Sequence, residues 1–340
     1  MLEIDGSYLE GGGQIVRTAI ALSAITKTPV MIYHIRKGRK KPGLKPQHLE
    51  GIRAAAKICK AELSGAELDS TELNFVPGEI CGGFYKIDTK TAGAITLILQ
   101  ILTPIAIFAD KSVKLDIRGG TAVPNSPNIL YFTHIFCYYL KRMGIEIKVE
   151  IKRHGFYPKG GGNVVVNINP GSLVPCDFYE PSRLKEVKVF AVSSYHLKNA
   201  RVAERLIMGF QNVYPEIKSK YQYIDADSPG CFIQAIAFFE NCVLGFDGLG
   251  EKGKSAEEIG KRTGELFKAG INNPPGADVY MLDQLIPYVA LVVSSTGRSV
   301  KIKYSELSMH TRTNMWVVTQ FLAVEFKIEK DILECRKFNN

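Results

Sequence analysis

Three segments of the chain repeat one pattern, in which a helix of small residues runs into a strand led by lysine and then into an amphipathic helix. The two clearest copies are residues 91–118 and 283–303, and an earlier copy covers residues 17–36. Self-similarity at this length indicates repeated supersecondary units, none of which can bury its apolar face alone. The chain must therefore fold as an assembly of units that share a core.

The spacing of the three copies is uneven. Ile35 matches Ile117 at an offset of 82 residues, whereas Val113 matches Val300 at an offset of 187. The difference, 187 − 82 = 105 residues, is the size of an extra domain between the second and third copies. We therefore predict three parts: residues 1–181 with the first two units, residues 182–273 as an inserted α/β domain, and residues 274–340 as the third unit that completes the body.

Local signals indicate the fold class. Residues 45–60 carry apolar side chains at helical spacing. Ser126 can cap a helix that begins at Pro127. Ser255 and Glu258 fit a capping box at the start of a helix in the inserted domain. The predicted class is α/β (α+β), with each unit a sheet that has helices packed on one face.

Composition excludes several classes of protein. The 340 residues are 46% hydrophobic, yet no stretch of eighteen or more is uniformly apolar, and the first residues lack the layout of a signal peptide. We therefore expect a soluble cytoplasmic protein with no membrane partner. The seven cysteines never form a C-x-x-C pair, so a disulfide framework or a zinc site is not expected, and we predict buried thiols. The oligomeric state is left open, a homodimer included.

Part of the chain's net charge of +9 comes from one basic segment. Residues 34–48, HIRKGRKKPGLKPQH, contain many lysines and arginines and no acid. One interpretation is a solvated surface loop. The other is a track for a phosphate backbone, favoured because Gly38, Pro42 and Gly43 constrain the segment as a loop that opens onto a helix.

Three glycine clusters are candidates for phosphate binding. They lie at 11–13, at 118–121 and at 154–162, the last with the sequence HGFYPKGGG. Consecutive glycines before a helix let backbone N–H groups approach a phosphate, although such a cluster is more often a simple turn. None fits the phosphate-loop or dinucleotide-binding fingerprints, so a phosphate-loop NTPase or a Rossmann dehydrogenase is not expected.

His310 and the segment 280–284 are the remaining candidates. His310 is predicted to lie in a loop between the last strand and the last helix, as a surface residue or as a nucleophile that could take a nucleotidyl group on its imidazole. The segment 280–284, YMLDQ, joins an aromatic ring that could stack on a base to a carboxylate that could hold Mg²⁺ or Mn²⁺. It reads equally well as a helix start capped by Asp283.

Taken together, these motifs resemble the RNA 3′-terminal phosphate cyclase family over nearly the whole chain. They are EGGGQIVRTA, RKGRKKPGLKPQH, RGGT followed by NSPN, HGFYPKGGG, YMLDQL and a terminal H-x-x-T-N. The resemblance implies three βαβαββ-type units and a smaller thioredoxin-like insertion. It also implies an ATP-dependent reaction in which a histidine takes AMP, passes it to an RNA 3′-phosphate, and leaves a 2′,3′-cyclic phosphate.

The resemblance also implies roles for individual residues. His310 would be the adenylated nucleophile, Tyr280 and Pro127 the two walls around adenine, and Asp283 with Glu10 the ligands of Mg²⁺ or Mn²⁺. The other positions expected to bind ATP are Glu10, Gln100, Met281, Leu282, Asp283 and Gln284. The positions expected to bind an RNA that ends in a 3′-phosphate are Arg17, Arg36, Arg39 and Gln47.

Two alternative functions remain. A non-catalytic relative that binds RNA in ribosome assembly would share the fold but lack the nucleophilic histidine, and the presence of His310 speaks against it. An enolpyruvyl transferase would also use repeated βαβαββ units. Such enzymes have six units in two equal lobes, whereas three units and one insertion are visible here.

Overall fold

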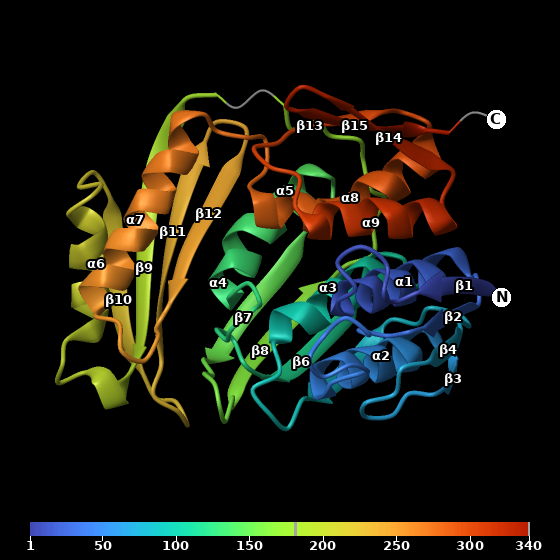
Figure 1. The fold of residues 1–340 in the computed structure, drawn as a ribbon, viewed down its shortest axis with the longest axis horizontal. Coiled ribbons are helices and arrows are strands. Elements are labelled where there is room, and N and C mark those ends of the chain that lie inside the picture. Colours follow the sequence, from blue (N-terminus) through green and yellow to red (C-terminus); the bar gives the residue numbers. More distant parts are fainter. Residues whose placement is uncertain (180–181, 339–340) are drawn as a thin grey trace.

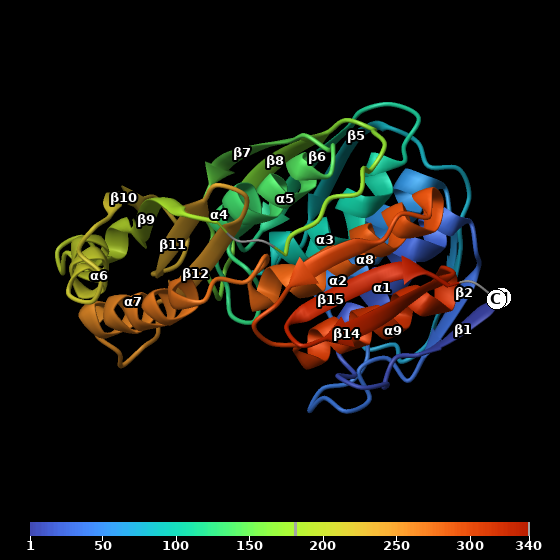
Figure 2. The same ribbon diagram turned by 90° about the horizontal axis from the view of Figure 1, so that it is seen from above.

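Helices fill the middle of the larger part of the molecule, and three sheets surround them (Figures 1 and 2). The structure is a computed structural model that describes residues 1–179 and 182–338. It confirms the mixed α/β class, because every sheet lies beside helices of the same stretch of chain. Figure 1 shows a smaller lobe, coloured yellow to orange, beside this body.

The first sheet joins one parallel and two antiparallel pairs of strands. Its strand order is β1-β2-β4-β3, with β1 and β2 parallel. Residues alternate between buried and partly exposed along β2 and β4, so that one face meets the helices. The elements are β1 (Leu2–Asp5), α1 (Gly13–Thr26), β2 (Val30–Tyr33), α2 (Pro46–Cys59), β3 (Glu62–Ser64) and β4 (Leu73–Val76).

The second sheet has the same strand order and the same sense of pairing, β5-β6-β8-β7. The helix expected from Pro127 begins later, at Ile129, because the Asn128 side chain accepts hydrogen bonds from Leu130 N and Tyr131 N; Asn128, and not Ser126, is therefore the cap. The elements are β5 (Gly83–Asp88), α3 (Ile95–Ile107), β6 (Val113–Gly119), α4 (Ile129–Tyr131), the π-helical turn η1 (Phe132–Phe136), α5 (Cys137–Arg142), β7 (Ile147–Arg153) and β8 (Gly162–Ile168).

The third sheet has three strands in the order β13-β15-β14, all antiparallel. Phe178 pairs with Ile302 of β13 as an isolated parallel bridge, so chain from before the inserted domain lies at the edge of this sheet. The elements are α8 (Val279–Thr296), β13 (Val300–Lys303), α9 (Met309–Phe321), β14 (Val324–Glu329) and β15 (Ile332–Lys337).

The smaller lobe has a four-stranded sheet, β10-β9-β11-β12, and a hydrophobic cluster of its own. Helices α6 and α7 pack against each other and against this sheet. Residue 181, the last of the first predicted part, lies outside the described ranges, and the predicted division of the chain stays a prediction. The elements are β9 (Leu184–Ser194), the 3-10 turn η2 (Tyr195–Leu197), α6 (Val202–Gln211), β10 (Lys218–Ile224), β11 (Cys231–Phe239), β12 (Val243–Leu249) and α7 (Ala256–Asn272), which Ser255 caps as expected.

Helix α8 is a long apolar helix of the described ranges. It is the one helix there that is long and apolar enough to cross a membrane, and 61% of it is buried inside the protein. Its apolar character is therefore explained by its place in the core. All seven cysteines are free, and four of them are buried while Cys81, Cys137 and Cys176 are partly exposed.

Asp278 joins the body to the smaller lobe. Its carboxylate caps α8 by accepting from Tyr280 N and Met281 N, and it also accepts from Tyr131 Oη at 2.6 Å and from Gly245 N of β12 at 3.0 Å. The side chain is buried, and burial raises the pKa of Asp278 even though these hydrogen bonds oppose the rise. One carboxylate thus holds three elements together.

Replacement of this carboxylate should destabilise the whole protein. A lost cap costs about 0.5–2 kcal/mol and each of the two buried donors left unpaired about 1–3 kcal/mol, so we expect Asp278→Ala to lower the free energy of unfolding by at least about 2.5 kcal/mol. Denaturant titration measures the change. Asp331→Ala is the control, because its exposed pairing with Lys303 at 3.9 Å is worth about 0–1 kcal/mol. Equal stability of the two variants would contradict the role of Asp278.

Candidate active site

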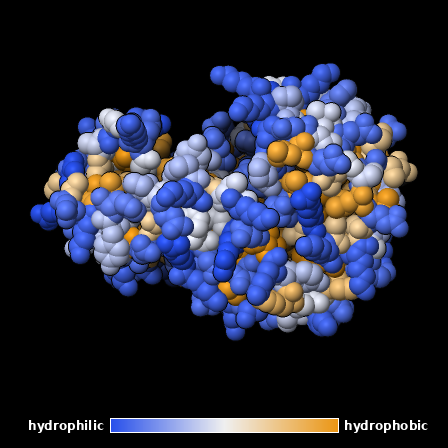
Figure 3. Space-filling view, turned by 90° about the horizontal axis from the view of Figure 1, so that it is seen from below, coloured by the Kyte–Doolittle hydropathy of each residue, from blue (hydrophilic) through white to orange (hydrophobic). Residues whose placement is uncertain are grey.

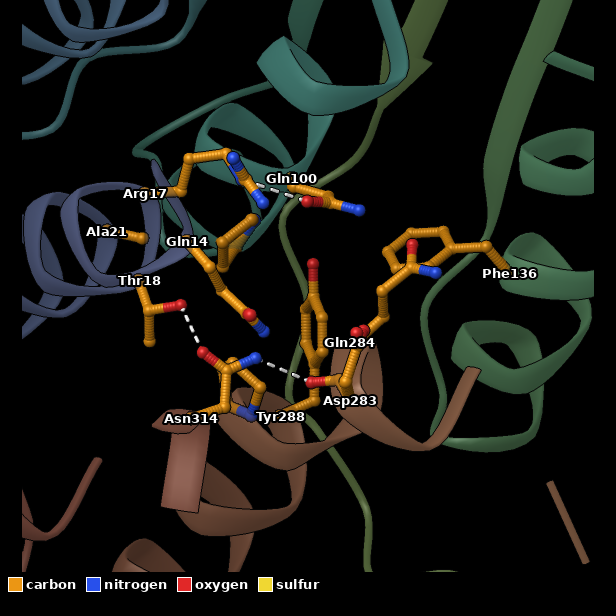
Figure 4. A pocket seen from close by; sticks show the side chains of 12 residues that line it. Gln14, Arg17, Thr18, Ala21, Gln100, Phe136, Asp283, Gln284, Tyr288 and Asn314 are labelled. Atoms are coloured by element: carbon orange, nitrogen blue, oxygen red, sulfur yellow. Dashed lines mark hydrogen bonds between the residues drawn. The ribbon is translucent and has the colours of Figure 1, made fainter. Parts of the chain in front are cut away.

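A cavity of about 490 Å³ lies where the body meets the smaller lobe. The body supplies the N-terminal turns of α1, α8 and α9, one face of α3 and the loop 122–128, and the lobe supplies β11 and β12. A smaller hollow adjoins it and shares Gln14, Arg17, Gln100, Asp283 and Gln284 (Figure 4). Polar side chains thus converge where several helices begin, which favours binding of a polar or anionic ligand.

His310 lies in the first turn of α9, and not in the loop that the sequence suggested. Ser308 caps this helix by accepting from Thr311 N, so the helix already begins at Met309 and includes His310. The Nδ1 atom of His310 hydrogen-bonds to the Oε1 atom of Gln14 and lies 3.9 Å from a carboxylate oxygen of Glu10. With Gln14 Oε1 as the acceptor, this hydrogen bond assigns the proton to Nδ1 and the lone pair to Nε2.

The charge state of His310 follows from its surroundings. Burial lowers the pKa of His310 below its ordinary value of 6.5, and the nearby charges of Arg17 and Arg39 lower it further. The ring is therefore neutral at physiological pH, with a free nitrogen lone pair. A neutral imidazole at the wall of a polar cavity is chemically able to act as a nucleophile.

Arg17 and Asp283 form the charged centre of the cavity. Arg17 Nε donates to Gln100 Oε1 at 3.0 Å, and both side chains lie across the hollow from Asp283 in Figure 4. Burial lowers the pKa of Arg17 to about 10 and raises that of Asp283 to about 7, while the attraction between them opposes both shifts. Asp283 is thus poised between its protonated and ionised forms near neutral pH.

Polar bonds hold α9 in place at the site. Thr18 Oγ1 donates to Asn314 Oδ1 at 2.7 Å, and Asn314 Nδ2 donates to the carbonyl oxygen of Asp283 at 2.7 Å (Figure 4). Glu10 N donates to Thr313 Oγ1 at 3.3 Å. The threonine and asparagine of the H-x-x-T-N motif therefore fix the helix that carries His310 against α1 and α8.

The glycine turn before α1 brings Glu10 beside His310. A Cβ atom at Gly12 would lie 2.1 Å from Glu10 Oε2, and one at Gly13 would lie 2.2 Å from Nε2 of His48, so a side chain at either position would displace one of these two groups. Glu10 pairs with Arg39, and its buried Oε2 atom has no hydrogen-bond partner among the described residues. This oxygen is available to a further cation or donor.

Some side chains of the segment 280–284 line the cavity, and others lie in the hydrophobic core. Tyr280 is 59% exposed and lines the cavity, as Pro127, Asp283 and Gln284 do. In contrast, Met281 and Leu282 are fully buried in the hydrophobic core and do not line the cavity, which differs from the role expected for them. The cap of this helix is Asp278, and not Asp283 as the alternative interpretation held.

The basic segment is a folded loop. Arg36 has a left-handed backbone conformation and donates to the carbonyl oxygens of Lys41 and Gly43, both at 2.9 Å, so its guanidinium holds the loop closed. Arg39 reaches Glu10, at the edge of the site. Gln47 accepts from Ala94 N at 3.1 Å and thereby satisfies the start of α3.

The sequence analysis missed several residues of the site. Gln14 belongs to the motif EGGGQIVRTA, and Asn314 belongs to H-x-x-T-N. The spacing of three residues between Gln14 and Arg17, about one helical turn, could have placed both side chains on one face of a helix. Asp247 and Phe232 reach the cavity from the smaller lobe, and no sequence pattern connects them to it.

A metal would find few protein ligands here. Among the described residues no group of three His, Cys, Asp or Glu side chains is arranged to hold an ion. The orphaned Oε2 of Glu10 and the carboxylate of Asp283 nevertheless fit a Mg²⁺ or Mn²⁺ ion that takes its other ligands from water and from substrate phosphates.

The fold and site define a mixed α/β protein whose helix-filled body and smaller lobe enclose a polar cavity with a neutral histidine. The model of the family described as RNA 3′-terminal phosphate cyclase matches residues 8–328. A protein named RNA 3′-terminal phosphate cyclase from Methanosarcina barkeri is 43% identical over 338 residues, which cover 97% of each chain. A protein of the same name from Thermococcus kodakarensis is 40% identical, over 97% of this chain and 95% of its own. Another from Pyrococcus furiosus is also 40% identical, over 98% of this chain and 97% of its own. The chain belongs to the RNA 3′-terminal phosphate cyclase family.

The charge pair at the centre of the cavity can be tested directly. The positive charge of Arg17 lowers the pKa of Asp283, so Arg17→Met should raise that pKa above its value of about 7. The ¹³C chemical shift of the Asp283 carboxyl carbon, followed by NMR across pH, measures it. Arg53→Met, on the exposed side of α2, is the control and should leave the pKa unchanged. A lower or equal pKa in Arg17→Met would contradict the coupling.

Proposed function

We propose that this enzyme converts an RNA 3′-terminal phosphate to a 2′,3′-cyclic phosphate at the expense of ATP, with His310 as the adenylated nucleophile. One observation carries the proposal. The His310 ring is neutral, Gln14 binds its Nδ1, and its Nε2 forms no hydrogen bond with the described residues, at the wall of a cavity that contains Arg17, Asp283 and Tyr280. The family to which the chain belongs supports the overall reaction.

In the first step, Nε2 of His310 attacks the α-phosphorus of ATP; a P–N bond forms, a P–O bond breaks, and pyrophosphate leaves. Tyr280 and Pro127, both on the cavity wall, would stack on the adenine. Arg17 would contact the phosphates, since its guanidinium lies inside the cavity beside Gln100. The carboxylate of Glu10, 3.9 Å from Nδ1, would stabilise the positive charge that develops on the ring.

In the second step, an oxygen of the RNA 3′-phosphate attacks the same phosphorus and frees His310. The RNA then ends in a pyrophosphate link to adenosine. In the third step, the neighbouring 2′-hydroxyl attacks the 3′-phosphorus, loses its proton and expels AMP. Adenylation is needed because a phosphate monoester has no good leaving group, whereas AMP leaves readily.

A divalent ion held by Glu10 and Asp283 would neutralise charge on the phosphates when bound. Asp283 can serve only in its ionised form, and its pKa of about 7 makes this form available at and above neutral pH.

Neither alternative function fits as well. A non-catalytic relative has no use for a nucleophilic histidine with Nδ1 bound to a glutamine and Nε2 free. An enolpyruvyl transferase is set aside because the chain belongs to the cyclase family over residues 8–328.

Removal of the nucleophile should stop the reaction at its start. We expect His310→Ala to form no protein–AMP adduct with α-labelled ATP and to make no cyclic end from a 3′-phosphorylated RNA, with its circular dichroism unchanged. His196→Ala, another exposed histidine on η2, is the control and should behave as wild type. The same His310→Ala variant should still cyclise a chemically adenylated RNA. Cyclisation from ATP and a 3′-phosphate by this variant would overturn the proposal.

The basic loop should serve the RNA, with its two arginines acting differently. Arg39→Ala should flatten the log–log dependence of RNA affinity on salt by roughly one unit, because one phosphate contact is lost. Arg36→Lys should weaken RNA binding less than Arg36→Ala, since a lysine can still donate to one of the two loop carbonyls. Arg53→Ala is the control. Unchanged slopes in all variants would show that the loop is a solvated surface.

A further inference from the structure

The turn that joins β7 to β8 has no role in the chemistry described above. It covers residues 154–161, most of the HGFYPKGGG segment, and reaches the lower edge of the molecule in Figure 1. Figure 3 views the molecule from that side and shows a mostly hydrophilic face that runs from the smaller lobe to the body. A long sequence signature at this edge needs a physical explanation.

Hydrogen bonds and close backbone contacts fix the shape of this turn. His154 Nδ1 hydrogen-bonds to Thr121 Oγ1 at 3.1 Å, and Gly160 N donates to the carbonyl oxygen of Phe156 at 2.8 Å. Gly160 and Gly161 have φ values of 75° and 74°, and a Cβ at Gly161 would lie 2.0 Å from Asp227 Oδ2. The turn therefore holds one conformation.

The turn is attached to the wall of the cavity. Phe156 is 2% exposed and packs in a small cluster with Ala122 and Phe232, and both of these also line the cavity. Lys159 N donates to Ser228 Oγ in the smaller lobe at 3.2 Å. Whatever the tip of the turn carries is thus held at a fixed position beside the mouth of the site.

The tip carries Tyr157, which is 67% exposed between the buried Phe156 and the exposed Lys159. In the described parts of the chain its ring stacks on no other aromatic ring, and Lys159 forms no ion pair. A rigid turn thus presents one bare aromatic face and one unpaired cation to solvent. Proteins that bind single-stranded nucleic acid use this combination. The bases stack on the aromatic rings, and the phosphates lie near the cations.

The same turn also touches the region expected to hold RNA. A Cβ at Gly160 would lie 2.5 Å from the carbonyl oxygen of Thr91, and one at Gly93 would lie 3.2 Å from Cβ of Gln47. The loop 89–94 therefore connects the turn to Gln47 at the start of α2, and it carries the exposed Lys90. Through this loop, the turn is linked by close packing to Gln47 in the basic segment.

We propose that this turn is a subsite for the RNA strand next to its 3′-terminal nucleotide. Tyr157 stacks on a base, and Lys159 binds a neighbouring phosphate. The subsite accepts any base, because every base has a face that can stack on a ring. The inference rests on the proposed function, since it places the RNA whose 3′-end reacts at His310.

The first test removes bases one at a time. A series of 3′-phosphorylated RNA 12-mers carries an abasic residue at successive positions from the 3′-end, and KM for RNA is measured for wild type, Tyr157→Ala and Tyr157→Phe. In wild type one abasic position should raise KM about 5- to 150-fold. In Tyr157→Ala, KM for the intact RNA should already be raised by the same factor. An abasic residue at that position should then raise KM no further, and kcat should be unchanged. Tyr157→Phe should behave as wild type because it keeps the ring.

Tyr195→Ala is the matched control, since Tyr195 is also an exposed tyrosine with a lysine near its ring but lies on η2, in the smaller lobe. It should leave KM and the abasic profile unchanged. Self-adenylation by labelled ATP needs no RNA and should be equal in all four proteins. If wild type formed no protein–AMP adduct, the proposed function would fail; if the adduct formed but Tyr157→Ala matched wild type in KM and profile, only the subsite would fail.

A second measurement detects contact without turnover. Trp316 is the single tryptophan of the chain, so Tyr157→Trp combined with Trp316→Phe places one fluorescent ring at the turn. A 3′-phosphorylated RNA should quench this emission, whereas an RNA abasic at the sensitive position should not. Equal quenching by both RNAs would overturn base stacking. Absence of quenching by RNA, with RNA bound by another assay, would show that the turn serves another partner, such as a protein.

Discussion

The structure depends on one constraint: three sheets, each apolar on a single face, must share one core. The core cluster joins Val16 of α1, Ile98 of α3, Leu285 of α8 and Val317 of α9, and these helices contact one another across the three sheets. A sheet of three or four strands with one helix layer buries too little apolar surface to be stable alone. The helices therefore meet end to end and side by side, and their N-terminal turns converge.

That convergence explains the site. The first turns of helices carry free N–H groups and partial positive charge, so a place where α1, α8 and α9 begin together favours anions. The same place is deep enough to desolvate charged side chains, which lowers the pKa of His310 and Arg17 and raises that of Asp283. The electrostatics of the cavity thus follow from the packing of the core, and the smaller lobe completes the wall.

Local signals in the sequence predicted part of this arrangement well. The helix at 45–60 and the cap at Ser255 follow from patterns within a few residues, and the structure confirms both. The local signals failed at positions whose structure depends on residues far away in the sequence. Asn128 displaces Ser126 as a cap while its amide donates to Gln234 in the smaller lobe, and Met281 and Leu282 face the core because α8 packs on both sides. No pattern in the chain connects Asp247 to the cavity, because that connection exists only after two parts of the fold meet.

The bond between Thr18 and Asn314 links positions 296 residues apart in the chain. During synthesis, the first helix leaves the ribosome long before the last one exists. At about 5–20 residues per second, the delay is about 15–60 s. For that time α1 can pack against α2, α3 and the first sheet, but the side of it that α9 covers has no partner. Any truncated product that ends before α9 therefore lacks His310 and cannot complete the wall of the cavity.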